Sequence, residues 1–502
     1  MNRLIGLSRL TPISQFLKHQ HLHTMATHYD VIVLGSGQSG NPVAKAFANA
    51  GRKTAVIERT ALGGTCVNVG CTPTKTMIAS GRAAYMTKRG KDYGVHEGNG
   101  NVEIDMARVR QRKREIVEQW NAGSVRGLDA AGVDVIMGDG SFVGEKKLKV
   151  LLNNGGEKEV SADQIFINVG ERPSRPDITG LDDVDPARVL NSTTIMELGE
   201  VPQRLVVLGG GYIGLEFGQL FRRFGSEVTV IQRAKQLVPR EDTDVAKCLM
   251  DILQQDGITV HLSSTVNSIS ASKDTKTPFA VSVKTPGGET EVSGTHLLLA
   301  TGRVPNTDSL NLSEVGIKTT PRGHIIVDDK LQTTASDIYA IGDCHGGAAF
   351  THMSYDDSRI IRTNLIPEAM SSTTPAMPTT KASISRVLTP YVMYTDPQLG
   401  HVGLHTRDLA NSSREVKIAT MPMSYVARAL ETAEPRGMMK ATVDAKTGDI
   451  LGFTCLGLEG GEIMSIVQTA MMGNLKWWDL EAAVYAHPTL AESLNNLWGH
   501  WE

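Results

Sequence analysis

An arrangement of strand, glycine-rich loop, helix and second strand occurs near the start of this chain of 502 residues. The apolar run 29–34 leads into Gly35, Gly37 and Gly40, an alanine-rich helix follows, and the second strand ends in Glu58. Such glycines allow a tight turn and close approach of a pyrophosphate. The helix N-terminus favours the negative charge, and an acid about 20 residues further on binds ribose hydroxyls. Together these features predict a Rossmann-like α/β domain that binds a dinucleotide.

The same arrangement recurs in the middle of the chain. The strand 204–208 leads into a loop with Gly209, Gly211 and Gly214, and a helix and a second strand, 227–231, follow. A single glycine motif is weak evidence, but strand, loop, helix and strand in this order are strong evidence for the fold. We therefore expect two Rossmann-like domains, each with its own nucleotide.

The second copy lacks the acid that ends the first. Counting 23 residues from the first glycine of each loop reaches Glu58 in one copy and Gln232 in the other, which Arg233 and Lys235 follow. Loss of the carboxylate removes an acceptor for the ribose 2′-hydroxyl, and cations can accept a 2′-phosphate. This predicts NADPH as the preferred nucleotide, with NADH possible. The alternative is that both cations are simply solvated in a loop.

Two of the five cysteines, Cys66 and Cys71, lie close together in a glycine-rich stretch. On a regular α-helix their separation corresponds to about 7.5 Å of rise, which is too far for a disulfide. Gly64, Gly70 and Pro73 favour a distorted helix start that brings the thiols together. A bridge across so short a loop adds little stability, so we expect redox chemistry. A pair of buried structural thiols is the alternative.

The composition excludes several classes of protein. A net charge of -3 gives no electrostatic reason to expect nucleic acid or a membrane surface as a partner. No apolar run has the length of a membrane span. Five cysteines in so long a chain do not form a secreted disulfide scaffold. Cys248, Cys344 and Cys455 are expected to be buried thiols without partners, and no metal site is predicted.

The first 25 residues have a composition of their own. They carry Arg3, Arg9 and Lys18, and no acidic residue occurs before Asp30. This is typical of a mitochondrial transit peptide. The alternative is an upstream in-frame or disordered extension, with translation starting at Met25. The protein is therefore expected to be mitochondrial or cytoplasmic.

The ends of two apolar strands and a polar linker indicate where the rest of the chain divides into domains. An apolar strand at 165–169 ends at Gly170, and its analogue at 297–300 precedes Gly302 and Arg303. A long charged helix is expected at 102–131, and 369–381 is a polar linker rich in proline and threonine. The predicted domains are the first nucleotide-binding domain, the second, a return to the first, and a C-terminal α+β unit. Their limits are 26–176, 177–302, 303–378 and 379–502.

Three motifs resemble those of the class I flavoprotein (pyridine nucleotide) disulfide reductases, the family of glutathione reductase, lipoamide dehydrogenase and mercuric reductase. They are Gly64–Cys71 followed by Pro73 and Lys75, then Gly342–Asp343, and finally His487–Leu490 with Glu492. The resemblance covers nearly everything after residue 27. It implies a glutathione reductase-like fold of two Rossmann-like domains with a C-terminal dimerisation domain. The runs 350–354 and 423–429 resemble the mercuric-reductase-like branch, which includes reactive-chlorine-resistance flavoproteins.

The resemblance also implies roles for individual residues. Cys71 is the thiolate next to the flavin and Cys66 attacks the substrate. The ion pair of Lys75 with Glu216 tunes the flavin, and Tyr212 covers the flavin face until the nicotinamide displaces it. A base, His487 oriented by Glu492, comes from the other subunit of a homodimer. The implied ligands of FAD and of the nicotinamide nucleotide are Gly35, Gly37, Gly40, Glu58, Gly64, Thr65, Lys75, Gly170, Asp343, Gly209, Gly211, Tyr212, Gly214, Gln232, Arg233, Gly302 and Arg303.

The departures from the family pattern bear on the substrate. No cysteine pair precedes Ala26 or lies in 498–502, so the soft ligands expected for handling mercuric ion are absent from the sequence. The candidate acceptors are therefore a small oxidant such as a hypohalous acid, Cu(II) or a quinone, or else a low-molecular-weight or peptide disulfide. Reductases of the dihydrolipoamide or glutathione type, and a flavin-bound redox sensor without turnover, are the alternatives.

Overall fold

The computed structural model describes residues 27–96, 102–366, 382–385, 388–410 and 412–502. The predicted transit peptide and the predicted linker at 369–381 lie outside the described residues. Within the described part of the chain, every helix is too short or too polar to span a membrane. The residue limits predicted for the domains remain predictions, because the sheets themselves do not fix them.

The first sheet has six strands. Five of them precede the second nucleotide-binding half in the chain, and one follows it. β1 (Thr27–Leu34) lies in its centre, parallel to both β2 (Thr54–Glu58) and β5 (Glu157–Ile167). β16 (Ile338–Ala340) joins β5 in parallel, although about 170 residues separate them. β3 (Asp134–Gly144) and β4 (Lys147–Leu152) complete the sheet. β1 and β2 are almost wholly buried, which explains why their sequences are continuous apolar runs.

The second sheet repeats the parallel arrangement. β8 (Arg204–Leu208) lies at its centre between β9 (Glu227–Ile231) and β14 (His296–Leu299). β10 (Thr259–His261) and β7 (Val189–Leu190) form its edges. A smaller antiparallel sheet is inserted before β14 and consists of β11 (Thr265–Ala271), β12 (Phe279–Thr285) and β13 (Gly288–Gly294). The prediction of two Rossmann-like domains is therefore confirmed.

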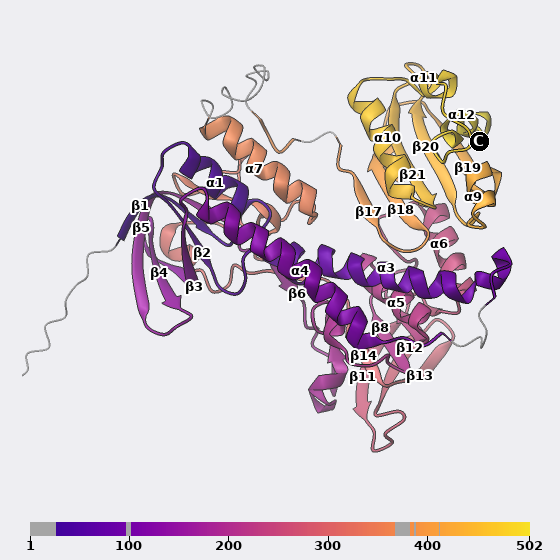
Figure 1. Ribbon diagram of the computed structural model, residues 1–502, viewed down its shortest axis with the longest axis horizontal. Helices are drawn as coiled ribbons and strands as arrows, with labels where there is room; N and C mark the ends of the chain where they lie inside the picture. Colours follow the sequence, from indigo (N-terminus) through magenta and orange to yellow (C-terminus); the bar gives the residue numbers. More distant parts are fainter. Residues whose placement is uncertain (1–26, 97–101, 367–381, 386–387, 411) are drawn as a thin grey trace, which may run out of the picture.

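The C-terminal unit is α+β, as predicted. Its antiparallel sheet has five strands, in the order β17 (Tyr391–Met393), β18 (Gln398–Gly403), β21 (Ile450–Gly457), β20 (Met438–Asp444) and β19 (Val416–Pro422). α10 (Gly460–Met472) covers this sheet, and α11 (Trp477–Ala482) and α12 (Ser493–Asn496) lie at its far end (Figure 1). Met393 and Leu399 are fully buried and share one apolar core with residues of the second nucleotide-binding half.

Four helices pack in two pairs, one beside the first sheet and one in the middle of the molecule (Figure 1). α1 (Gly40–Asn49) and α7 (Thr351–Leu365) pack against each other beside the first sheet. α3 (Cys71–Lys88) packs against α5 (Tyr212–Phe224), which follows the second glycine loop. A Cβ on Gly81 would lie 2.6 Å from Leu220 Cδ1, so the close approach of these two helices requires glycine.

The long helix predicted at 102–131 begins four residues later, as α4 (Met106–Asp129). The carboxylate of Asp105 accepts a hydrogen bond from the backbone N–H of Arg108 at 2.9 Å and so defines the N-terminus of the helix. α4 packs along α3. Its charged surface is solvated, as expected, except that Lys113 is buried and pairs with Glu197.

Candidate active site

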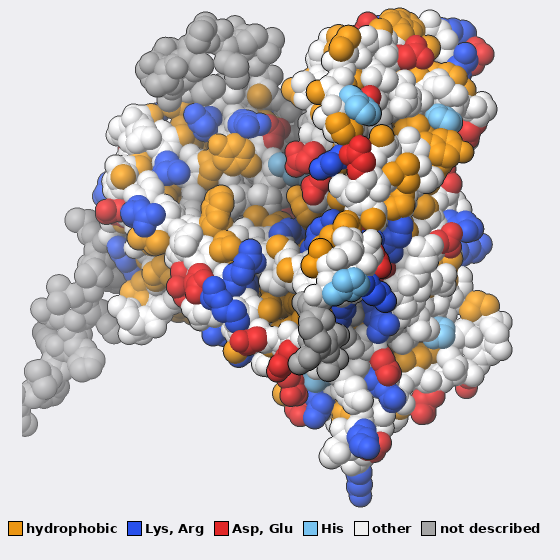
Figure 2. Space-filling view, turned by 45° about the vertical axis from the view of Figure 1, so that its right-hand side comes forward, with side chains coloured by type: hydrophobic (Ala, Val, Ile, Leu, Met, Phe, Trp, Pro, Cys, Tyr) orange, Lys and Arg blue, Asp and Glu red, His pale blue; other side chains and the backbone are white. Residues whose placement is uncertain are grey.

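A large cavity lies where the first sheet, the second sheet and the C-terminal unit meet. Its volume is about 1470 Å³. Part of its opening is visible as the recess between the C-terminal unit at upper right and the rest of the molecule at upper left (Figure 2). The predicted site residues that line it are Gly35, Gly37, Glu58, Gly64, Thr65, Cys66, Cys71, Lys75, Gly170, Gly211, Tyr212, Glu216, Gly302, Arg303 and Asp343. The structure thus brings together residues that lie more than 250 positions apart in the chain.

Cys66 and Cys71 lie on two separate helical segments. Cys66 is in α2 (Gly64–Asn68), and Cys71 begins α3 after a break at Val69 and Gly70. A Cβ on Gly70 would lie 2.7 Å from the carbonyl oxygen of Thr65, so the break requires glycine. The predicted distortion is present, and it places the two thiols within hydrogen-bond reach of each other. Both are in the reduced form here.

The electrostatics of the pair are asymmetric. The hydrogen bond from the Cys66 thiol, opposed by partial burial and helped by the Lys75 ammonium, lowers the pKa of Cys71 to about 6. The same hydrogen bond, followed by burial, raises the pKa of Cys66. These shifts favour the negative charge on Cys71 and the proton on Cys66. The roles of the two thiols in the reaction remain predictions.

Thr351, the first residue of α7, contacts both sulfur atoms. Its hydroxyl donates to Cys66 Sγ at 3.0 Å and lies 3.4 Å from Cys71 Sγ. The hydroxyl lowers the pKa of both thiols. Thr351 was not among the predicted site residues, although it lies in the run 350–354 that marked the family branch. Its function depends on a contact across 280 residues, which spacing in the sequence cannot indicate.

Lys75 and Glu216 form the predicted ion pair. Lys75 Nζ donates to Glu216 Oε2 at 2.7 Å, and the other carboxylate oxygen accepts from the backbone N–H of Tyr394 at 2.8 Å. Burial alone lowers the pKa of Lys75, but the carboxylate of Glu216 and the thiolate of Cys71 raise it above its usual value. The Lys75 ammonium also lies 5.0 Å from the ring centre of Tyr394. Tyr394, from the C-terminal unit, is a second residue that sequence reasoning missed.

The first glycine loop fits a bound dinucleotide. Glu58 Oε2 accepts from the backbone N–H of Ser36 at 2.9 Å and from its hydroxyl at 2.7 Å, so the acid is fixed beside the loop. A Cβ on Gly64 would lie 2.5 Å from the Cα of Gly37, which shows how tightly the loop and α2 approach. Asp343 faces the same cavity, accepts from Ser354 Oγ at 2.9 Å, and has a pKa raised by burial. These residues would hold the flavin dinucleotide.

The second glycine loop has the same form with a neutral partner. Gln232 is buried, and its Oε1 accepts from the backbone N–H of Gly210 at 3.2 Å. It therefore holds its loop as Glu58 holds the first one, but without a negative charge. Arg233 and Lys235 are exposed beside it. A Cβ on Gly211 would contact nothing within 4 Å, so this glycine opens toward the cavity rather than into protein.

Two other groups of predicted site residues, Arg303 and the pair of His487 with Glu492, make contacts within the protein. Arg303 donates to the side chain of Glu171 at 3.3 Å and to its backbone carbonyl at 2.6 Å, so it supports the wall of the cavity between Gly170 and Gly302. His487 Nδ1 lies 2.9 Å from Glu492 Oε2, which confirms their proximity. This pair does not line the cavity of its own chain, and the His487 side chain is 68% exposed.

Comparison with protein families decides the classification. The model of the pyridine nucleotide-disulphide oxidoreductases matches residues 29–363, and the model of their dimerisation domain matches residues 389–497. The chain belongs to the pyridine nucleotide-disulphide oxidoreductases. Members of this flavoprotein family use FAD and a pyridine nucleotide, in agreement with the two glycine loops of the site.

Individual members of the family cover almost the whole chain. An Escherichia coli (strain K12) protein named "Probable pyridine nucleotide-disulfide oxidoreductase RclA" is 34% identical over 93% of this chain and 98% of its own. A mercuric reductase of Bacillus cereus is 34% identical over 93% of this chain and 70% of its own. Both are bacterial proteins and give no support to the mitochondrial alternative.

A solved structure shows the same architecture. The Cu(II) complex of the HOCl-induced flavoprotein disulfide reductase RclA from Escherichia coli matches this oxidoreductase with a TM-score of 0.83. The sequence identity is 33%, and the match covers 94% of this chain and 99% of that one. The resemblance to the mercuric-reductase-like branch that the motifs indicated is therefore confirmed.

Proposed function

We propose that this oxidoreductase is a homodimer that passes electrons from NADPH to the disulfide form of Cys66 and Cys71, and from the resulting thiols to a small oxidant. The observation that carries the proposal is the polarised thiol pair, with the pKa of Cys71 at about 6 and that of Cys66 raised, beside Lys75 in one cavity. When bound, FAD supplies a two-electron carrier between the nicotinamide and this disulfide.

The residues of the chain account for the thiol half of the reaction. Reduction of the disulfide takes up two electrons and one proton and leaves Cys71 ionised and Cys66 protonated. Cys66 must lose its proton to attack, because the thiolate is the nucleophile. With a disulfide substrate, Cys66 forms a mixed disulfide and expels one substrate thiolate, and Cys71 then displaces the other to restore the bridge. With a small oxidant, the two thiols transfer the same two electrons.

The base for this step is supplied by the partner subunit's His487. In a single chain, His487 lies outside the cavity of Cys66, yet Glu492 holds its ring at 2.9 Å as an orienting carboxylate would. Val484, three residues before it, is fully exposed, and Met472 is 68% exposed. Exposed apolar side chains in the same unit as an oriented histidine support burial against a second copy, in keeping with the dimerisation-domain match.

The preference for NADPH is supported by the second loop. Gln232 offers a neutral amide where Glu58 offers a carboxylate, so a 2′-phosphate meets no repulsion there. The exposed cations Arg233 and Lys235 lie close enough in sequence to bind that phosphate. The small-oxidant class is supported by the relatives, since the solved RclA structure is a Cu(II) complex of an HOCl-induced protein.

Anaerobic titration with NADPH tests the proposal. We expect the flavin to bleach and a long-wavelength absorption band to develop, with about one equivalent of NADPH for each disulfide reduced. Steady-state assays with hypothiocyanite, Cu(II), quinones, glutathione disulfide and lipoamide then separate the substrate classes. A purified protein without flavin would exclude the enzyme, and a bound flavin that NADPH leaves oxidised would favour the redox sensor.

A further inference from the structure

The ring of Tyr212 is part of the wall of the cavity. Tyr212 is the first residue of α5, directly after the second glycine loop. Its ring centre lies 5.6 Å from that of Tyr391 and 6.3 Å from that of Phe350, and all three residues line the cavity. Tyr212 therefore lines the cavity next to the second glycine loop, where a nicotinamide nucleotide bound at that loop would meet its ring.

The Tyr212 hydroxyl is held by a buried carboxylate that the reaction described above does not use. Glu241 is 1% exposed, and its Oε1 accepts from the Tyr212 hydroxyl at 2.9 Å and from the Tyr391 hydroxyl at 2.8 Å. Burial raises the pKa of Glu241, and its Oε2 has no hydrogen-bond partner among the described residues. A buried carboxylate with so few partners is costly, so this position needs an explanation.

The backbone that carries Glu241 is strained. Val238 has a φ of +37°, a conformation that a β-branched residue adopts at a cost. The strained turn is fixed at both ends: Val238 N–H donates to the carbonyl of Gly210 at 2.8 Å, and Glu241 N–H donates to the carbonyl of Val238 at 2.9 Å. The turn thus ties Glu241 to the glycine loop that precedes Tyr212.

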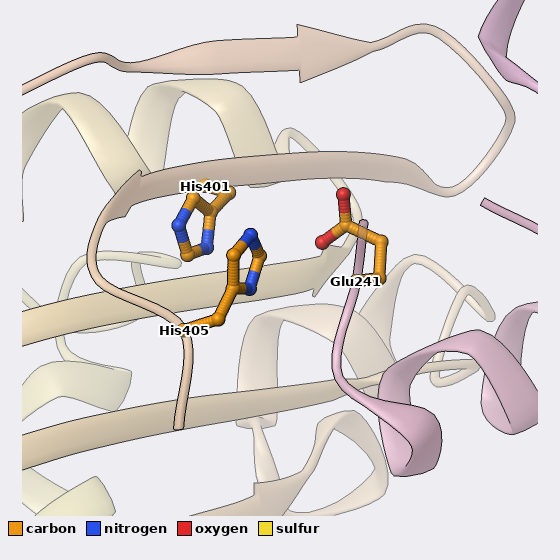
Figure 3. Close-up of side chains that lie close together, drawn as sticks. All are labelled: Glu241, His401 and His405. Carbon is orange, nitrogen blue, oxygen red and sulfur yellow. The ribbon is translucent and has the colours of Figure 1, made fainter. Parts of the chain in front are cut away.

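The contacts of Glu241 continue into the C-terminal unit. Tyr391 Oη also lies 3.0 Å from His405 Nε2, and His405 stacks on His401 with ring centres 3.8 Å apart and planes at 9° (Figure 3). Glu241, His401 and His405 are residue types that can bind a metal ion, and their ligand atoms lie within 4.8 Å of one another. However, lone pairs of stacked, parallel imidazoles do not converge, and both ring nitrogens of His401 already contact Thr454 and Gly403. The cluster therefore suits hydrogen bonding rather than a metal ion.

We propose that Glu241 is a positioning residue that latches Tyr212 over the cavity, and that the latch opposes entry of the nicotinamide nucleotide. The proposal rests on the proposed function, because it assigns Glu241 to the reductive half of that reaction. Moving Tyr212 aside breaks a buried hydrogen bond to a carboxylate. Such bonds favour the closed position by about tenfold or more. Tyr391 and His405 hold the carboxylate in place from the C-terminal unit.

Stopped-flow reduction of the flavin by NADPH tests the latch in the full-length protein. Tyr212→Phe keeps the ring and removes the hydroxyl, and Glu241→Gln keeps the shape and removes the charge. For both we expect the NADPH concentration at half-maximal reduction rate to fall about five- to tenfold, since the closed state is disfavoured. The double variant should gain no more than Tyr212→Phe alone, because Tyr212→Phe already removes the bond that Glu241→Gln weakens. In Glu241→Gln, turnover at saturating NADPH should change less than about twofold.

Tyr355→Phe serves as the matched control, because Tyr355 lies outside the cavity lining on the exposed side of α7. In this variant, NADPH should reduce the flavin with the same half-saturating concentration as in the wild type. An unchanged half-saturation in Tyr212→Phe, or additive effects in the double variant, would overturn the latch while wild-type flavin reduction still upheld the proposed function. If NADPH fails to reduce even the wild-type flavin, the proposed function fails instead. If Glu241→Gln loses its flavin or unfolds at a lower temperature than the wild type, the result for Tyr212→Phe alone tests the latch.

Discussion

Lys75 Nζ lies 2.7 Å from Glu216 Oε2, and this ion pair joins the helix that begins with Cys71 to the helix that follows the second glycine loop. The contact matters because the ammonium lies close to the Cys71 thiolate and lowers the pKa of that thiol. The ion pair holds the two nucleotide-binding halves together and also fixes the ammonium that lowers the pKa of Cys71.

Replacing Lys75 should shift the titration of Cys71. In Lys75→Met the thiolate loses its neighbouring cation, so the pKa of Cys71 should rise from about 6 by about one unit. Thiolate absorbance of the reduced protein, followed against pH, measures the shift. The sign is fixed: the thiolate is present above the pKa and lost below it, so the loss should occur at higher pH in the variant. Lys75→Arg retains the charge and should titrate nearer to the wild type.

The Thr351 hydroxyl should act in the same direction. Thr351→Val removes the donor to Cys66 Sγ and the contact with Cys71 Sγ, both of which lower thiol pKa values. The pKa of Cys71 should therefore rise, and the pH at which the reduced enzyme loses its long-wavelength band should rise with it. Thr351→Ser keeps the hydroxyl and is the matched control. If the Cys71 thiol had the same pKa in Thr351→Val and Thr351→Ser, the Thr351 hydroxyl would have no effect on its ionisation.

Nucleotide selectivity should depend on the loop after β9. Neutralising Arg233 and Lys235 together should raise the KM for NADPH about tenfold or more and leave that for NADH nearly unchanged, because only NADPH carries the 2′-phosphate. Steady-state kinetics with both nucleotides measure the ratio. Lys273→Gln removes an exposed cation from the β11–β12 connection and should alter neither. Equal losses for the two nucleotides would contradict the phosphate site.

Subunit mixing should show whether the site is shared. Cys66→Ser and His487→Ala should each be nearly inactive with oxidant, whereas NADPH should still reduce the flavin of His487→Ala. If each cavity takes its histidine from the partner, every mixed dimer contains one intact site. Random mixing of equal amounts then restores about a quarter of wild-type activity, since half of the dimers are mixed. No recovery after verified exchange would place the base elsewhere.

A buried ion cluster behind the site should control stability. Asp396 is largely buried and accepts from Arg82 Nη1 at 2.5 Å and from Arg223. Burial raises its pKa, but the two guanidinium groups outweigh burial and lower it. Asp396→Asn should reduce the free energy of unfolding by about 3 kcal/mol, measured by urea denaturation. Asp182→Asn, at a side chain 91% exposed, is the control and should cost little.

The same carboxylate gives a pH dependence of definite sign. Because the folded pKa of Asp396 is depressed, its contribution to stability is present above the unfolded pKa of about 3.9. It is lost as the pH falls through the folded value. The difference in unfolding free energy between wild type and Asp396→Asn should therefore be constant near neutral pH and shrink below about pH 4.

Much of this protein followed from local patterns. Glu58 and Gln232 could be placed because a glycine loop specifies its own acid at a nearly fixed distance along the chain. Cys66 and Cys71 could be recognised because glycine and proline around them forbid a regular helix. The expected start of α4 was wrong by four residues, because the capping bond of Asp105 defines the end of a helix more sharply than its periodicity does.

The sequence by itself determined the two dinucleotide folds, the redox pair and the family, because each depends on residues close together in the chain. The tertiary structure decided which groups surround the sulfurs. Thr351 and Tyr394 reach the cavity from separate units, across contacts that no spacing encodes. The charge on Cys71 depends in part on Thr351 and Glu216, which are distant in the chain, since a thiol pKa responds to every charge and donor within a few ångströms.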